Sequence, residues 1–115
     1  MVHHLIEALL WILRRRRRVQ IVGASMVPTH ADGDDVLVDP RAYRRRPPQE
    51  GHIVLASHPT VANTLIVKRV ARVEPDGRLF VVGDNPDPLA STDSRQFGAI
   101  RVERVQGRVT ARFPW

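Results

Sequence analysis

The chain has 115 residues and a net charge of +6, from 18 basic and 12 acidic side chains, which fits one domain with a single hydrophobic core. Hydrophobic residues make up 43% and charged residues 26%, a balance that excludes an intrinsically disordered chain. The sequence has no cysteine, which excludes disulfides, thiol catalysis and cysteine-ligated metal sites.

The first 18 residues combine an apolar run, 5–13, with five consecutive arginines, 14–18. The run contains Glu7 and is too short to span a bilayer, which needs about 20 apolar residues. A secretory signal has its positive charges before the apolar run, whereas these follow it. Four apolar side chains recur at helical spacing: Leu5, Leu9, Ile12 and Leu13. We expect a short helix that packs on the domain or brings residues 5–18 to a membrane face.

Beyond the arginines, short β-branched stretches alternate with turn residues as far as the C-terminus. The pattern predicts seven strands: Val19–Val22, Asp35–Val38, Ile53–Ala56, Leu65–Val73, Leu79–Val82, Ala99–Val105 and Arg108–Arg112. Seven short strands without a long helix predict a mainly β domain, either a barrel or a coiled antiparallel sheet. We therefore divide the chain into a helix with its arginine run, 1–18, and a β domain, 19–115.

The connections between these strands carry further signals. Residues 74–77, Glu-Pro-Asp-Gly, favour a tight turn and predict an antiparallel hairpin of the strands on either side. Two polar, proline-rich loops cover residues 39–52, with a second arginine run at Arg44–Arg46, and residues 83–98. Because long loops in small domains are usually functional or tightly self-bonded, 83–98 is a candidate for function.

Lys68 is the only lysine, and the other 17 basic residues are arginine. A lysine acts as a general base once it loses its proton, which arginine cannot do in a protein. Strand alternation places Lys68 on one face with Ile66 and Val70, where desolvation lowers a lysine pKa towards neutrality. On the strand pattern alone, a surface lysine on an edge strand is the favoured alternative.

Ser25 lies in Gly23-Ala24-Ser25-Met26-Val27-Pro28-Thr29, directly after an apolar strand. At such a turn the serine hydroxyl is exposed, and its backbone N–H is free to donate to a developing oxyanion. An ordinary turn serine has the same local pattern. Other catalytic or ligand-binding sites have weaker support in the sequence. The histidines show neither the spacing of a catalytic triad nor that of metal ligands, and no glycine-rich phosphate loop occurs.

Four sequence blocks occur in the order found in type I signal peptidases, and the chain resembles that family, within a wider group that includes the LexA-like self-cleaving repressors. The blocks are Ser25–Thr29, Gly33–Val38, Lys68–Val70, and Gly83–Asn85 continued by Ser91–Arg95 and Phe97-Gly98. The last block separates signal peptidases from the repressors. The resemblance covers about residues 19 to 112 and implies a signal-peptidase-like coiled antiparallel sheet, with 19–115 as the catalytic domain.

The resemblance also implies a Ser-Lys dyad that needs no metal or cofactor. In it, Ser25 attacks the scissile carbonyl, while Lys68 takes the serine proton and returns it to the leaving amine. Ser91 orients Lys68, and Asp93 with Arg95 forms a supporting ion pair. Some members carry a serine two residues before the nucleophile, where this chain, like other members, has Gly23. The loop before Ser91 departs from the family, because it is about two residues longer than usual.

The resemblance implies an extended protein substrate with small side chains near the cleaved bond. Small members without a membrane anchor are similar to the proteases that mature nickel-type superoxide dismutase. We therefore expect a cytoplasmic enzyme, peripheral at the inner membrane face, that removes the propeptide of that proenzyme. One alternative is a minimal general signal peptidase acting on secretory precursors.

A second alternative is a non-catalytic β module that binds an acidic partner through its arginine runs. Nucleic acid is not an expected partner, because aromatic residues make up only 5% of the chain and are dispersed.

Overall fold

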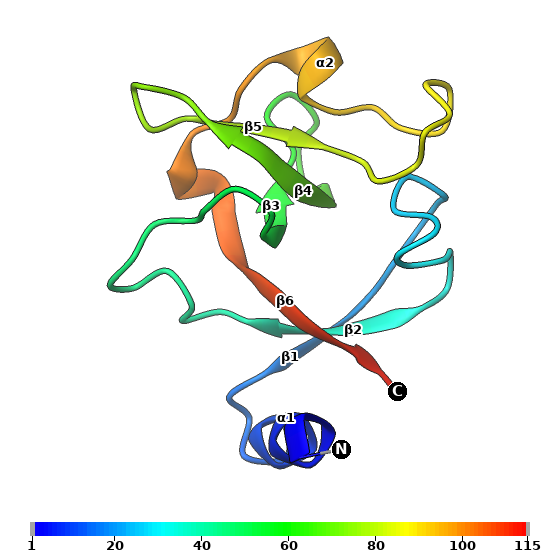
Figure 1. Ribbon diagram of the computed structural model, residues 1–115, viewed down its shortest axis with the longest axis vertical. Helices are drawn as coiled ribbons and strands as arrows, with labels where there is room; N and C mark the ends of the chain where they lie inside the picture. The colour runs from blue at the N-terminus through cyan, green and yellow to red at the C-terminus, as the bar shows by residue number, and fades with distance from the viewer. Residues whose placement is uncertain (1, 115) are drawn as a thin grey trace.

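The computed structural model describes residues 2–114, which form one six-stranded antiparallel sheet with two helices (Figure 1). The strands are β1 (Arg17–Gln20), β2 (Asp35–Asp39), β3 (Ile53–Ser57), β4 (Leu65–Val73), β5 (Leu79–Val82) and β6 (Val105–Phe113). Their order across the sheet is β1-β2-β6-β3-β4-β5. Helix α1 (Val2–Ile12) precedes the sheet, while α2 (Ser94–Phe97) and a 3₁₀ turn, η1 (Val102–Arg104), lie between β5 and β6. The expected mainly β fold with a short N-terminal helix is confirmed.

The sheet coils around its own core. Register shifts occur in the β2–β6, β3–β6 and β4–β5 pairings, and such bulges bend strands and increase their twist. As a result β3 is buried on both faces. Val54 and Ala56 belong to one hydrophobic cluster with β4 and β5, whereas Leu55 belongs to a second cluster with β2. This coiling brings β1 towards β4, although the two strands are not neighbours in the sheet.

Most expected strands agree with the structure, and the β4–β5 hairpin is confirmed, with Gly77 at a φ of 88° in its turn. β1 begins two residues earlier than expected, so the division after residue 18 falls inside this strand. The separate strand expected at Ala99–Val105 is wrong. Only Ile100 bridges Leu79, after which η1 turns the chain and leaves Val102 exposed. β6 is therefore one strand that starts at Val105.

Helix α1 contacts the sheet at β6. Glu7 is buried there, and the Trp11 ring lies 4.9 Å from the Phe113 ring. The side that carries Leu5, Leu9, Ile12 and Leu13 is exposed, so the helix does not pack on the domain through its apolar face. Among the helices within residues 2–114, none has both the length and the apolar character required to cross a membrane.

Candidate active site

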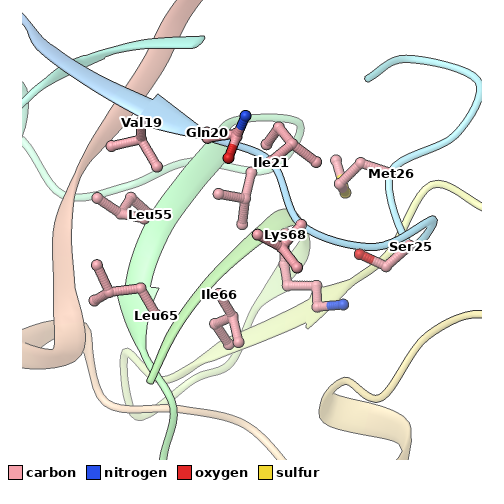
Figure 2. A pocket seen from close by; sticks show the side chains of 11 residues that line it. Val19, Gln20, Ile21, Ser25, Met26, Leu55, Leu65, Ile66 and Lys68 are labelled. Carbon is pink, nitrogen blue, oxygen red and sulfur yellow. The ribbon is translucent and has the colours of Figure 1, made fainter. Parts of the chain in front are cut away.

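Ser25 and Lys68 line the same cavity, which has a volume of about 140 Å³ (Figure 2). Ser25 lies in the turn that follows β1, and Lys68 lies in the middle of β4. Figure 2 shows the serine hydroxyl and the lysine amine pointing towards one another at one side of the cavity, whose apolar lining includes Ile21, Leu55 and Ile66. The coiling of the sheet thus brings together two side chains that are 43 positions apart in the sequence.

Lys68 is buried, with 5% of its surface exposed, so it is not the surface lysine that the strand pattern alone left open. Burial lowers the pKa of its amine below the ordinary value of 10.5, because the charged form loses its hydration. The Asp93 carboxylate acts in the opposite direction and the Arg95 guanidinium adds to the lowering. The neutral amine, which a general base requires, is therefore favoured relative to a lysine in water.

The Lys68 Nζ donates a hydrogen bond of 3.0 Å to Ser91 Oγ, which in turn donates one of 3.0 Å to Asp93 Oδ2. Because the serine proton is directed at the carboxylate, a lone pair of Ser91 Oγ faces the lysine. Within residues 2–114 no hydrogen bond links Lys68 to Ser25 Oγ, and such bonds often tighten only when substrate binds. The structure therefore brings Ser91 to Lys68, despite the longer loop before it.

Asp93 is fully buried and receives five hydrogen bonds at its carboxylate. Burial opposes ionisation, but the donors outweigh it and hold the pKa of Asp93 well below its ordinary value. Arg95 contributes its Nε, its Nη2 and its backbone N–H, while the Gly83 N–H donates at 2.9 Å. Asp93 also caps α2, together with Gln96 in a capping box. The expected Asp93–Arg95 ion pair is present, with Nη2 and Oδ2 2.7 Å apart.

Gly83 and Asn85 connect this network to the turn that carries Ser25. The Asn85 backbone N–H donates to the Ser25 carbonyl at 2.9 Å, and its side-chain Nδ2 donates to the Ala24 carbonyl at 2.8 Å. A Cβ added at Gly83 would lie only 2.5 Å from the Ser25 carbonyl oxygen and 2.5 Å from Ser91 Oγ. Only glycine therefore fits between the Ser25 turn and Ser91, the acceptor of the Lys68 hydrogen bond.

A second connection runs from β4 to the segment that follows Ser25. Arg69, next to Lys68, donates two hydrogen bonds of 2.8 Å to the Asp84 carboxylate, which also accepts from Thr29 Oγ1. No role was predicted from the sequence for Gly83, Asp84, Asn85, Arg69 or Thr29. The available signal was the turn-forming Gly83-Asp84-Asn85 at the start of a long polar loop, directly after a buried strand.

Comparison with known proteins places the chain among the peptidases. It matches the family described as "Signal peptidase, peptidase S26" over residues 1–76 and 71–115. The chain belongs to this family. This confirms the signal-peptidase relationship expected from the four blocks, whereas the finer likeness to the dismutase maturation proteases stays a prediction.

Two curated relatives come from Arabidopsis thaliana. The mitochondrial ATP-independent inner membrane protease subunit 1b is 33% identical over 109 residues, covering 76% of this chain and 63% of the relative. Subunit 1a is 28% identical over 112 residues, covering 78% of this chain and 66% of the relative. The chain therefore spans slightly less than two thirds of the length of these two relatives.

The backbone around Ser25 bears on where an oxyanion would bind in this S26 domain. Within residues 2–114 no acceptor takes the Ser25 N–H, so it is available to a substrate oxygen. The Gly23 N–H already donates to Asp32 Oδ1 at 2.8 Å. Elsewhere in the described chain, His/Asp/Glu side chains form no cluster that holds a metal, and no histidine lines the cavity of Ser25 and Lys68.

Proposed function

We propose that the protein is a serine endopeptidase of the signal peptidase type, with Ser25 as nucleophile and Lys68 as general base. The observation that carries the proposal is a buried lysine of lowered pKa that shares a cavity with the serine, in a chain of the S26 family. A binding module has no need of such a lysine. Because a buried lysine lowers the stability of the fold, its presence in a protein without catalytic function would be unexplained, which argues against the non-catalytic alternative.

In the proposed reaction, neutral Lys68 removes the proton of Ser25 Oγ as this oxygen attacks the scissile carbonyl. The Ser25 N–H stabilises the oxyanion of the tetrahedral intermediate. When the intermediate collapses, Lys68 returns the proton to the leaving amine, and an acyl-enzyme remains on Ser25. Lys68 then deprotonates a water molecule whose oxygen attacks the ester, and it returns this proton to Ser25 Oγ as the acyl group leaves as a carboxylic acid.

Ser91, Asp93 and Arg95 support the lysine in this scheme. Ser91 accepts from Lys68 and fixes the direction of its amine, and Asp93 holds the Ser91 hydroxyl in that orientation. Arg95 keeps Asp93 ionised. The Asp93 charge also stabilises the ammonium form that arises during the reaction, without touching the substrate.

The free edges beside the cavity are suited to an extended peptide. Among the strands of residues 2–114, β1 pairs only with β2, and residues 65–68 of β4 pair only with β3, because the pairing of β4 with β5 begins at Arg69. A substrate strand can therefore add its backbone between these two segments. The small, largely apolar cavity favours small apolar side chains near the cleaved bond.

For the natural substrate we propose a precursor with an N-terminal propeptide, specifically the proenzyme of nickel-type superoxide dismutase, processed in the cytoplasm. Support for this comes only from the sequence resemblance. The names of the two relatives, inner membrane protease subunits, favour the alternative of a membrane-associated precursor handled by a minimal signal peptidase.

The test is to incubate the protein with a dismutase proenzyme and with a secretory precursor, and to sequence the new N-termini. We expect Ser25→Ala and Lys68→Arg to abolish cleavage, the second because arginine cannot serve as the base. Ser57→Ala, in β3, controls for removal of a hydroxyl outside the cavity. Cleavage of the secretory precursor alone would contradict the dismutase proposal, and normal cleavage by Lys68→Arg would contradict the dyad.

A further inference from the structure

Helix α1 presents an apolar strip on the side that faces away from the sheet. Six large apolar side chains, each between 51% and 73% exposed, form it: Val2, Leu5, Ile6, Leu9, Ile12 and Leu13. They recur at intervals of three and four positions, so they lie on one side of the helix. We call these six residues the outer strip. In a helix that only stabilised the domain, such a strip would be turned inward.

The opposite side of α1 is anchored by polar contacts. Glu7 is only 4% exposed, and its carboxylate accepts from the Arg16 guanidinium and from Thr110 Oγ1 on β6. Burial opposes ionisation of Glu7, but these donors outweigh it and lower its pKa. Rolling the helix to hide the outer strip would break the Glu7 contacts and separate Trp11 from Phe113. The strip is therefore held facing outward.

Positive charge adjoins the outer strip. Four of the five arginines that follow α1 are exposed, namely Arg14, Arg15, Arg17 and Arg18. Within residues 2–114, Arg14 and Arg15 have no acidic partner, and Arg16 is directed inward to Glu7. An apolar strip next to unpaired arginines is complementary to a bilayer surface with anionic headgroups, where apolar side chains enter the acyl boundary and cations remain among the phosphates.

We propose that α1 is an interfacial helix that binds this protein to an anionic lipid bilayer, lying in the membrane plane with its outer strip inserted. The inference is independent of the peptidase proposal, because it uses no residue of the cavity. Figure 1 shows α1 at one end of the long axis, with β5 and α2 at the other. In the bound state the hairpin turn between β4 and β5 therefore lies far from the lipid.

Flotation with lipid vesicles tests the proposal. We expect binding to vesicles of equimolar phosphatidylcholine and phosphatidylglycerol, with little binding to phosphatidylcholine alone. Leu5→Gln with Leu9→Gln should weaken binding about a hundredfold. Arg14→Gln with Arg15→Gln should weaken it about thirtyfold, because each arginine contributes about fivefold at an anionic surface. Leu89→Gln and Arg101→Gln, exposed residues away from α1, serve as matched controls and should bind as wild type.

Several outcomes overturn the proposal: no binding to anionic vesicles, equal binding to neutral ones, or unchanged binding of the Leu5/Leu9 variant. A dimer that dissociates in the Leu5/Leu9 variant, without lipid binding, would instead identify a second copy as the occupant of the strip.

A second measurement identifies which side of the protein faces the lipid, and it changes only one residue of the outer strip. Because the chain has no cysteine, single cysteines carry an environment-sensitive dye at chosen positions. The emission of Leu9→Cys should shift to the blue on anionic vesicles, whereas that of Asp76→Cys, in the β4–β5 turn, should not. An equal shift at both positions, or a shift at Asp76 alone, would contradict the proposed orientation.

Discussion

Replacing Gly83 by alanine tests whether the spacing between Ser25 and Ser91 controls catalysis. The added Cβ would lie 2.5 Å from the Ser25 carbonyl oxygen and 2.5 Å from Ser91 Oγ, where ordinary contact begins at 3.4 Å. To remove this steric clash, the Ser25 carbonyl oxygen and Ser91 Oγ must each move away from the new Cβ by about 0.9 Å. A misplacement of about 1 Å at a catalytic centre lowers the rate about a hundredfold, and overpacking lowers stability by about 1–3 kcal/mol.

Gly107 provides a matched control for this substitution. A Cβ there would lie 2.6 Å from the Asp39 carbonyl oxygen and 2.6 Å from Val38 Cγ1, a comparable clash outside the cavity of Ser25 and Lys68. Gly107→Ala should therefore lower the free energy of unfolding to a similar extent while kcat/KM remains close to wild type. Urea denaturation and precursor cleavage measure the two quantities. Equal losses of kcat/KM in both variants, or none in Gly83→Ala, would refute the reasoning.

Three further predictions concern the residues around Lys68. Ser91→Ala should lower kcat about ten- to a hundredfold with a smaller change in KM, because Lys68 loses the acceptor that orients it. Ser91→Thr, which keeps a hydroxyl, should restore part of the rate. A loss confined to KM would contradict a positioning role for Ser91. Asp93→Asn should destabilise the fold at neutral pH by about 2–3 kcal/mol, less than a fully buried pair because the Arg95 side chain is 44% exposed. Because the pKa of Asp93 is lowered in the folded protein, its carboxylate stabilises the fold above pH 3.8, the ordinary pKa, and this stabilisation is lost as the pH falls further. In urea denaturation, the difference in free energy of unfolding between wild type and Asp93→Asn should therefore shrink towards acid pH. A difference that stays constant down to strongly acid pH would contradict this linkage. Asn85→Ala should reduce kcat by releasing the Ala24 carbonyl, with the melting temperature nearly unchanged, whereas wild-type kinetics would show that the backbone bond to Ser25 is sufficient.

The sequence predicted those parts of the site that depend on local periodicity. Alternation along β4 placed Lys68 on one face with Ile66 and Val70, and in the structure Lys68 and Val70 are buried on that face while Ile66 is half-buried. Turn chemistry predicted the β4–β5 hairpin. These predictions succeed because period-two patterns and turn residues act within a few positions of one another.

Local sequence patterns could not predict the features that depend on contacts between residues far apart in the chain. Helical spacing predicted α1 but not which side faces the sheet, because the Glu7 contact depends on Thr110, 103 positions away. The longer loop before Ser91 folds on itself through hydrogen bonds among Asn85, Asp87 and Leu89, and leaves Leu89 94% exposed. Residues 86–89 are therefore exposed, and Ser91 still reaches Lys68.

The central claim, that Lys68 is a base of lowered pKa, has one direct measurement, because the chain contains a single lysine. Labelling with ¹³Cε-lysine gives one side-chain NMR signal, which can be titrated in the folded protein and compared with the pH dependence of kcat/KM. We predict that the signal titrates well below 10.5, and that kcat/KM rises with pH through the same midpoint as the amine becomes neutral. Titration of Lys68 at its ordinary pKa of 10.5, with full activity at neutral pH, would contradict the account.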